Sequence, residues 1–427
     1  MNIKNYTRIL FCLFVTLLIA AGSASAADKK EKEANLYPNA TRKEPKIDMS
    51  SGTQKDLNKA LDLLNNNQED EAAPLIQKVL DDPKASKYAH ALALQASGQL
   101  AYDKQDNATA IKQFRAAYDA DALPNNAHFT LLYQIAQLQV QDEKYQDSLN
   151  TLDEFFKATG GVNKPEAYAL QGNDYYRLDQ YQPAVESIKK ALSLTDKPSD
   201  TWFQIMMASY VALEQFDQAA EVLKQQLAKT PNDAKIIRQL ATVYVKGNQN
   251  DKAIAVLADA KQKGLLTTED DYKLTTQLYD QADKPKDGAA FLKEGFDKGA
   301  VKPSYEMYKL LADSYALAQD DANAIDAYAK ASTFSKDGNV DYIRGSLLLN
   351  NDRAKEAVEA LKQAVAKGSL KKPGETYLLL GDSYNQLDNN PEAKAAWQKA
   401  KGYPSTQKMA EQRLAAGGHI KLNTKKN

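Results

Sequence analysis

The residues with the greatest capacity for chemistry are scattered along this sequence. The three histidines, His90, His128 and His419, lie far apart, and none has a second ligand at the spacing that a zinc site uses. No glycine-rich phosphate loop, serine nucleophile elbow or zinc-binding helix motif occurs. The adjacent acids Asp270-Asp271 and Asp320-Asp321 fall at the ends of predicted helices, where carboxylates commonly act as caps. The sequence therefore predicts no catalytic residue, no metal site and no cofactor, and we expect that the protein is not an enzyme.

Small residues recur with a spacing that predicts packed helices. A small residue is followed by another small one 12 positions later, by a large apolar one 16 later and by a small one 19 later. The six copies that keep this phase begin at Gly98, Gly172, Ala241, Ala312, Gly345 and Gly381. Polar turns such as Asn350-Asn351-Asp352 separate the two halves of the copies. Each copy predicts two antiparallel helices, with the small residues where the two backbones come closest.

Weaker copies fill the gaps between these six. They begin at Ala60, Ala136 and Met207, and a poor copy pairs Thr275 with Asp287, Phe291 and Glu294. Strand signals are absent, so we predict an all-α fold of about ten helix pairs between residues 53 and 404. Because Gly288 interrupts the poor copy, the helix pair at residues 268–300 is either irregular or shifted in register.

The copy between Pro373 and Pro404 is the most regular. The residues in phase are Tyr377, Leu380, Gly381, Tyr384, Ala393, Trp397 and Ala400. This pattern resembles the tetratricopeptide repeat (TPR), a helix–turn–helix unit of 34 residues. The resemblance implies a right-handed superhelical solenoid, with a concave face lined by the first helix of each pair. The helix predicted at residues 405–416, with Met409 and Leu414 on one side, would cap its end.

Such a concave face suits an extended peptide or a helix of a partner protein. Tyr102 and Tyr176 stand four residues after the first small position, and Tyr210 lies near the same phase. These tyrosines form either an aromatic strip for a partner or ordinary packing between helices. The polar residues predicted for the same face, or else for ordinary charged surface, are Asn173, Arg238, Lys309 and Asp313. Some TPR proteins grip a C-terminal carboxylate with a lysine and an asparagine, but Ala169 stands where that lysine is needed, so we do not expect this clamp.

The first 26 residues have the pattern of a cleavable export signal. Lys4 and Arg8 precede an apolar run at residues 9–21, and small residues follow at 22–26. The 13-residue run is too short for a permanent membrane helix, although an uncleaved anchor is the alternative. The only cysteine, Cys12, lies in this leader, so the chain after cleavage contains no thiol, which suits an oxidising compartment. We expect the protein in the periplasm of a Gram-negative bacterium.

Two further segments lie outside the predicted array. Residues 27–52 are polar, carry Pro38 and Pro45, and predict a tether or loosely packed arm. Residues 417–427 predict a basic disordered tail. With 55 basic and 56 acidic residues the chain has no net basic field for nucleic acid, and no stretch after the leader is apolar enough to insert into a membrane.

Three kinds of short motif add to the generic repeat. They are Thr41-Arg42-Lys43-Glu44-Pro45, the Lys-Gly pairs in Lys263–Thr267 and Lys298-Gly299, and above all the stretch from Lys367 to Gly381. Each Lys-Gly pair predicts a helix that ends at a residue able to adopt a left-handed conformation. With these motifs the chain resembles the exported TPR proteins that accompany TonB-type energy-transduction systems in Gram-negative bacteria.

That resemblance implies a non-catalytic periplasmic scaffold. Its partners would be periplasmic segments of TonB-like proteins or of inner-membrane motor proteins, in the uptake of iron-siderophore or haem complexes. The alternative is an envelope-assembly factor that supports polysaccharide export or outer-membrane protein biogenesis.

Overall fold

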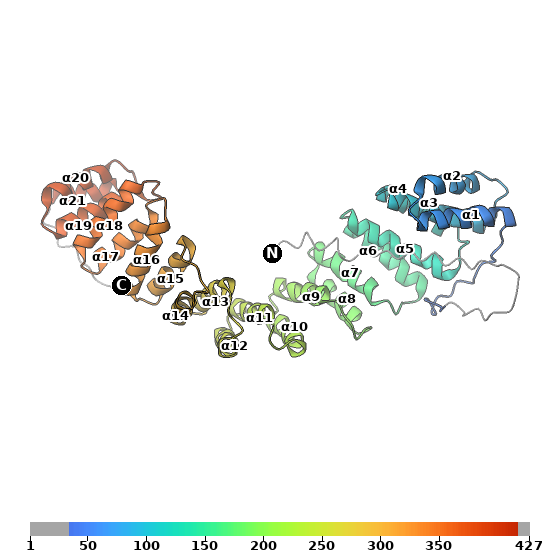
Figure 1. Ribbon diagram of the computed structural model, residues 1–427, viewed down its shortest axis with the longest axis horizontal. Coiled ribbons are helices and arrows are strands. Elements are labelled where there is room, and N and C mark those ends of the chain that lie inside the picture. Colours follow the sequence, from blue (N-terminus) through green and yellow to red (C-terminus); the bar gives the residue numbers. More distant parts are fainter. Residues whose placement is uncertain (1–33, 417–427) are drawn as a thin grey trace. The chain divides into compact units, whose positions relative to one another are not determined.

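The computed structural model describes residues 34–416, and these form 21 α-helices and no strands (Figure 1). The predicted all-α repeat fold is therefore confirmed. The predicted leader at residues 1–26 and the basic tail at residues 417–427 lie outside the described residues. The chain divides into two compact units, residues 1–215 and 216–427. Within residues 34–416, no helix combines the length and the apolar character that crossing a bilayer requires.

The first unit holds nine helices. They are α1 (Ser51–Asn65), α2 (Glu69–Leu80), α3 (Lys87–Asp103), α4 (Asn107–Asp119), α5 (Asn125–Gln141), α6 (Tyr145–Thr159), α7 (Pro165–Arg177), α8 (Tyr181–Leu192) and α9 (Asp200–Ala212). Within this unit each helix from α1 to α8 packs against the next one along the chain.

The second unit holds the other twelve helices. They are α10 (Phe216–Lys229), α11 (Ala234–Lys246), α12 (Asn250–Gln262), α13 (Glu269–Gln281), α14 (Pro285–Asp297), α15 (Tyr305–Leu317), α16 (Asp321–Phe334), α17 (Asn339–Asn350), α18 (Ala354–Lys367), α19 (Pro373–Gln386), α20 (Asn390–Lys401) and α21 (Gln407–Ala415). Here too each helix packs against its successor.

The small residues lie where the two helices of a pair come closest, as their spacing predicts. A Cβ atom added at Gly381 would stand 2.4 Å from Cδ1 of Trp397, and one at Gly172 would stand 2.7 Å from Cδ1 of Ile188. The alanines at the second small position are fully buried in six pairs: Ala110, Ala184, Ala253, Ala324, Ala357 and Ala393. A larger side chain at either position would force the helices apart, because protein interiors leave no spare volume.

A left-handed residue closes the turn after every odd-numbered helix from α1 to α19. The ten residues, with φ between 54° and 61°, are Asn67, Gln105, Glu143, Asp179, Glu214, Asn248, Asp283, Gln319, Asp352 and Asp388. Six of the ten are asparagine or aspartate, which tolerate this conformation better than most residues. The ten turns agree with the predicted number of about ten helix pairs, and nine of these pairs pack together within one of the two units.

The helix pair at residues 268–300 is shifted in register and not irregular, which decides between the two alternatives that the sequence left open. The regular phase runs through Thr276, Gly288, Leu292 and Gly295, one residue later than the copy that begins at Thr275. Thr276 and Leu292 are fully buried, and the Thr276 hydroxyl donates to the Gly288 carbonyl at 3.2 Å. The pair α13–α14 is therefore an ordinary repeat in which threonine takes the place of the first small residue.

The terminal helix α21 packs on α20, as a cap requires. Arg413 donates from Nη2 to Oδ2 of Asp382 in α19 at 2.8 Å. Leu414 packs against the core of the last pair, but Met409 is 40% exposed, and Ala410 takes the buried position instead. The predicted apolar side of this helix is thus only partly correct.

The segment before α1 is not a loose tether. Although residues 34–50 form no helix, Tyr37 is only 4% exposed and packs among buried side chains of α5, α6 and α7. The polar composition of residues 27–52 did not indicate that one aromatic side chain, Tyr37, would be buried.

Candidate protein-binding surfaces

The three tyrosines predicted for a binding strip have different surroundings. Tyr102 is half-buried against the core of helices α1–α5, and Tyr176 is half-buried with its ring centroid 5.9 Å from that of Tyr181. Tyr210 is only 6% exposed, with the Lys189 ammonium 5.6 Å from its ring centroid. No ring contact joins any two of the three within the described part of the chain. Tyr210 is therefore largely covered by neighbouring side chains, and partner binding by all three tyrosines stays a prediction.

The predicted polar groove residues are all engaged with neighbouring side chains. Arg238 forms an ion pair with Asp271, which also caps the start of α13 together with Thr268. Lys309 pairs with Asp313 at 2.6 Å, and Asp313 also accepts from the Tyr328 hydroxyl at 2.7 Å.

Asn173 is the fourth polar candidate. It donates from Nδ2 to the buried carboxylate of Asp174 at 3.3 Å. The polar candidates thus stabilise the helices around them, and their binding to a partner stays a prediction.

Two carboxyl groups and one imidazole that are wholly or partly buried have strongly displaced pKa values. Burial raises the pKa of Asp174 to about 7 and that of Asp280 to about 6, and it lowers the pKa of His128 to about 4. These groups lie on α7, α13 and α5, and within the described residues no hydrogen bond or ion pair joins any two of them. Between residues 34 and 416 no group of three histidine, cysteine or acidic side chains could hold a metal ion.

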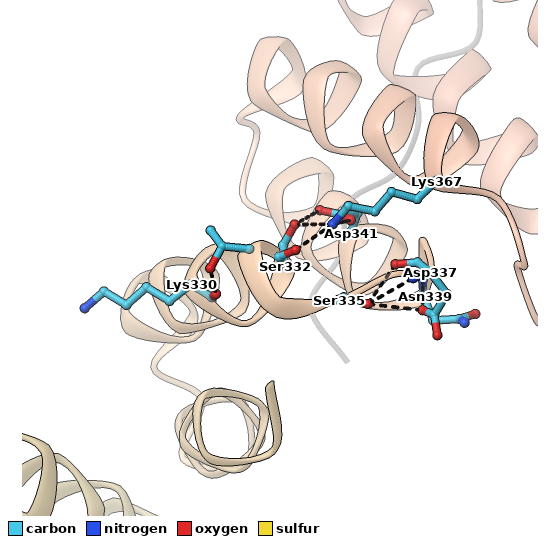
Figure 2. A network of polar contacts seen from close by, with 8 residues as sticks. Lys330, Ser332, Ser335, Asp337, Asn339, Asp341 and Lys367 are labelled. Atoms are coloured by element: carbon cyan, nitrogen blue, oxygen red, sulfur yellow. Dashed lines mark hydrogen bonds and ion pairs between the residues drawn. The ribbon is translucent and has the colours of Figure 1, made fainter. Parts of the chain in front are cut away.

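A serine, a lysine and an aspartate converge where α16, α17 and α18 meet (Figure 2). The Lys367 ammonium lies 2.8 Å from Oδ2 of Asp341 and also donates to the carbonyl oxygen of Ser332 at 2.6 Å. The Ser332 hydroxyl donates to Oδ1 of Asp341 at 2.5 Å. Asp341 is fully buried, so the ammonium is needed to neutralise its charge. This geometry holds three helices together. Because the Asp341 carboxylate is paired with Lys367, it is not free to act as a base toward the Ser332 hydroxyl.

The glycine after Lys367 completes the same junction. Gly368 has φ 69° and ψ −156°, a conformation open essentially to glycine alone, and its carbonyl accepts from Gly338 N at 3.0 Å. Gly264 and Gly299 have φ of 67° and 70°, so all three Lys-Gly pairs end their helices as predicted. The most distinctive motif of the sequence therefore has a structural role here.

A groove runs between α14 and α16, with α15 as its floor. It comprises a cavity of about 490 Å³ and another of about 430 Å³, which share Lys293, Asp297 and Tyr315. Tyr308, Leu311 and Tyr315 form the floor of the larger cavity. Asn323, Asp326, Ala327 and Lys330 of α16 form one wall, and Lys293, Phe296 and Asp297 of α14 form the other.

A second groove occupies the same position two repeats later, between α18 and α20. Its cavity of about 280 Å³ is lined by Tyr377, Leu380 and Tyr384 of α19 and by Glu392, Ala395, Ala396 and Lys399 of α20. Relative to the small residues of their own pairs, these positions match those of the first groove one for one. We call the two the tyrosine–lysine grooves.

In each tyrosine–lysine groove a lysine stands over a tyrosine ring. The Lys330 ammonium lies 5.7 Å from the Tyr308 centroid, and that of Lys399 lies 5.3 Å from the Tyr377 centroid. Lys190 stands in the same way over Tyr168, at 5.8 Å, in the pair α7–α8. Within residues 34–416 none of these three lysines forms an ion pair, so their charges can meet a carboxylate of a partner.

These grooves were not predicted, although a pattern in the sequence marks them. A tyrosine four residues before the first small position and a lysine six residues after the second occur together in the pairs that begin at Gly172, Ala312 and Gly381. The predicted concave face is lined by the first helices alone, whereas the groove walls come from the second helices.

Comparisons with known proteins identify the type of repeat. Models of the tetratricopeptide repeat match residues 57–127, 165–198 and 210–265. The chain therefore carries tetratricopeptide repeats, and the predicted repeat type is confirmed in these segments.

Known proteins that resemble the chain include further TPR proteins. The interferon-induced protein with tetratricopeptide repeats 2 of Cricetulus griseus is 30% identical over 88 residues, which is 20% of this chain and only 18% of the length of that protein. A TPR protein from Parabacteroides merdae has 14% identity and a TM-score of 0.37, over 67% of this chain and 94% of that one. The C-terminal part of a TPR protein from Cytophaga hutchinsonii has 14% identity and a TM-score of 0.39, over 66% and 99%.

Proposed function

We propose that this chain is a non-catalytic periplasmic scaffold for protein partners of a TonB-type energy-transduction system. The observation that carries the scaffold role is the tandem array of helix pairs, ten by their turns, with tetratricopeptide repeats in three matched segments. Such an array builds a long surface from neighbouring units, which suits extended segments and helices of other proteins.

The tyrosine–lysine grooves are the proposed contact surface in the second unit. Tyrosine gives a large, rigid contact area at a low entropic cost, and each groove places two tyrosines in its floor. The lysines over the rings supply positive charge without a bound carboxylate. A partner segment with apolar and acidic side chains would complement both features.

The TonB-type partner and the periplasmic location rest on the sequence. The pattern of residues 1–26 supports export, and the motifs in the arm, at the Lys-Gly pairs and at Lys367–Gly381 support the particular kind of TPR protein. Because Lys367 and Gly368 have a structural role in the junction of α16, α17 and α18, that motif alone does not identify a partner.

Photo-crosslinking in intact cells tests this proposal. A crosslinking residue replaces Lys330 in the groove, and the matched control replaces Lys355, an exposed lysine of α18 outside the grooves. We expect the Lys330 position to capture TonB-like or inner-membrane motor proteins at least several times more efficiently than the Lys355 position. Capture of polysaccharide-export or barrel-assembly proteins instead would favour the envelope-assembly alternative and reject the TonB role.

A further inference from the structure

The arm before α1 follows the links that join successive helix pairs. Leu36 and Arg42 contact the start of α5, Asn39 contacts the link before α7, and the carbonyl of Asp48 accepts from Ser86, which precedes α3. The arm thus crosses three successive links without forming a helix, and a hydrogen-bonded turn from Tyr37 to Ala40 interrupts it.

Two adjacent asparagines at the start of α5 hold the backbone of the arm. Asn126 accepts from Leu36 N and donates to the Ala34 carbonyl, both at 3.0 Å. Asn125 donates from Nδ2 to the Arg42 carbonyl at 3.0 Å. A side-chain amide that satisfies both the N–H and the C=O groups of an extended strand recognises its backbone whatever its side chains are.

Tyr37 supplies the aromatic anchor of the arm. Its ring meets Phe129 and Phe155 edge-on, at centroid distances of 5.4 and 5.8 Å. Its hydroxyl lies 3.0 Å from the Thr130 hydroxyl, so the pocket satisfies the polar end of the ring as well.

Arg42 and Glu44 add charge recognition. Arg42 forms an ion pair with Asp121 at 2.6 Å and donates to Oδ1 of Asn125 at 2.6 Å. The Glu44 carboxylate accepts from Asn125 N at 3.1 Å, at the positive end of the α5 dipole. The surface at α5 therefore recognises a tyrosine and an arginine that follows it five residues later.

The arm packs on one edge of the pair α5–α6. Ala136 and Ser148, at the two small positions of this pair, are fully buried, whereas Tyr37 of the arm contacts Phe129 of α5 and Phe155 of α6. Leu36 and Ile47 of the arm are 56% and 58% exposed. The arm is therefore held by the buried Tyr37 and by polar contacts, whereas two of its apolar side chains face solvent.

We propose that the link edge formed by α5, α6 and α7 is a peptide-binding site for a non-helical segment in which a tyrosine is followed by a turn and, five residues after the tyrosine, by an arginine, and that the chain masks this site with its own residues 34–44. A tethered peptide has an effective concentration of about a millimolar, so a partner segment binds only when it outcompetes the arm. This inference does not depend on the TonB proposal.

Peptide binding to the full chain tests the inference. The probe is a fluorescent synthetic peptide with the sequence of residues 34–46, titrated by anisotropy into the wild-type chain and into the double variant Tyr37→Ala/Arg42→Ala. We expect the double variant to bind the peptide at least about tenfold more tightly than the wild type does, because its own arm no longer competes. Ile47→Ala is the matched control, since this exposed side chain leaves the arm bound and should give wild-type binding.

Two further variants check that the peptide uses the same contacts. Adding Asn126→Ala to the double variant, or replacing the tyrosine of the peptide with alanine, should reduce binding at least about tenfold, since each removes an anchor of the segment. Equal peptide affinity of the wild type and a folded double variant would overturn the inference. A wild-type dimer that becomes a monomer on Tyr37→Ala/Arg42→Ala would overturn masking in cis, because the occupant would then be the arm of a second copy.

Hydrogen exchange of the wild-type chain covers the case in which the double variant does not fold. The amides of residues 34–44 should exchange at least about a hundredfold faster than those in the middle of α5, because a bound arm can leave while the helices stay folded. Equal protection of the arm and of α5 would overturn the inference.

Discussion

At the scale of single residues, the buried carboxylates show how the array accommodates charge. Asp341 is neutralised by Lys367 and Asp382 by Arg413, whereas within the described residues Asp174 forms no ion pair, and the amide of Asn173 donates to its Oδ1 at 3.3 Å. Burial therefore raises the pKa of Asp174 from 3.8 to about 7. In the unfolded chain the same carboxyl loses its proton near its ordinary value. Folding is thus penalised once the pH is high enough to ionise Asp174.

The first prediction concerns the variant Asp174→Asn. A raised pKa means that the contribution of Asp174 to stability falls as the pH rises from about 4 to about 7, and stays low above that range. The amide cannot ionise, so at pH 8 the variant should be more stable than the wild type, by at most about 4 kcal/mol. At pH 4.5 most of this difference should vanish.

Urea denaturation at the two pH values measures the effect. Asp153→Asn, at an exposed position of α6, serves as the control and should change stability by less than about 0.5 kcal/mol at both. An equal gain for Asp174→Asn at pH 4.5 and at pH 8 would show that ionisation is not its cause.

At the scale of elements, each helix pair depends on the contact between a small residue and the large residue 16 positions later. Trp397 is fully buried above Gly381, and its Nε1 donates to Oδ1 of Asp382 at 2.9 Å. The indole therefore cannot move without losing this hydrogen bond.

The second prediction concerns the variant Gly381→Ala. Its new Cβ would lie 2.4 Å from Cδ1 and from Nε1 of Trp397, so the two helices must separate. We expect a loss of about 1–3 kcal/mol, visible as a lower melting temperature by circular dichroism. Gly52→Ala in α1 is the matched control: no atom lies within 4 Å of its added Cβ, and it should leave the melting temperature unchanged or raise it. Similar melting of the two variants would contradict the assigned close approach.

At the scale of the whole molecule, stability comes from neighbours along the chain. The packing within each unit joins helices that are adjacent or next but one in sequence, which is the arrangement of a repeat array. Such an array is sensitive at its open ends, and α21 covers one of them with Ala410, fully buried, and Arg413.

The third prediction concerns truncation after Gly402, which removes α21. The exposed pair α19–α20 should fray, so its amides should exchange at least about tenfold faster, while α1–α8 keep their wild-type exchange. Hydrogen exchange read by mass spectrometry measures both regions in one experiment. Truncation after Ala416 is the control and should leave both unchanged, and uniform acceleration along the chain would contradict the neighbour-only coupling.

The sequence by itself determined the repeats. The helix pairs, the polar turns and the Lys-Gly ends follow from residue types at short spacing, because a helix and its turn are specified within one unit. At the pair α13–α14 the copy identified from the sequence began one residue too early, at Thr275. Thr276 takes the place of the usual small side chain, and only its burial against α14 shows this register.

Only the tertiary structure showed which side chains of different helix pairs contact one another. Arg238 and Asp271 are 33 residues apart, Lys367 and Ser332 are 35 apart, and Tyr37 and Thr130 are 93 apart. Such contacts depend on how one helix pair lies on the next, and the spacing within a repeat does not encode that. The packing of the arm and the grooves between second helices could not be predicted for the same physical reason. Both are formed by segments that are distant in sequence and that only the packing of the helices brings together.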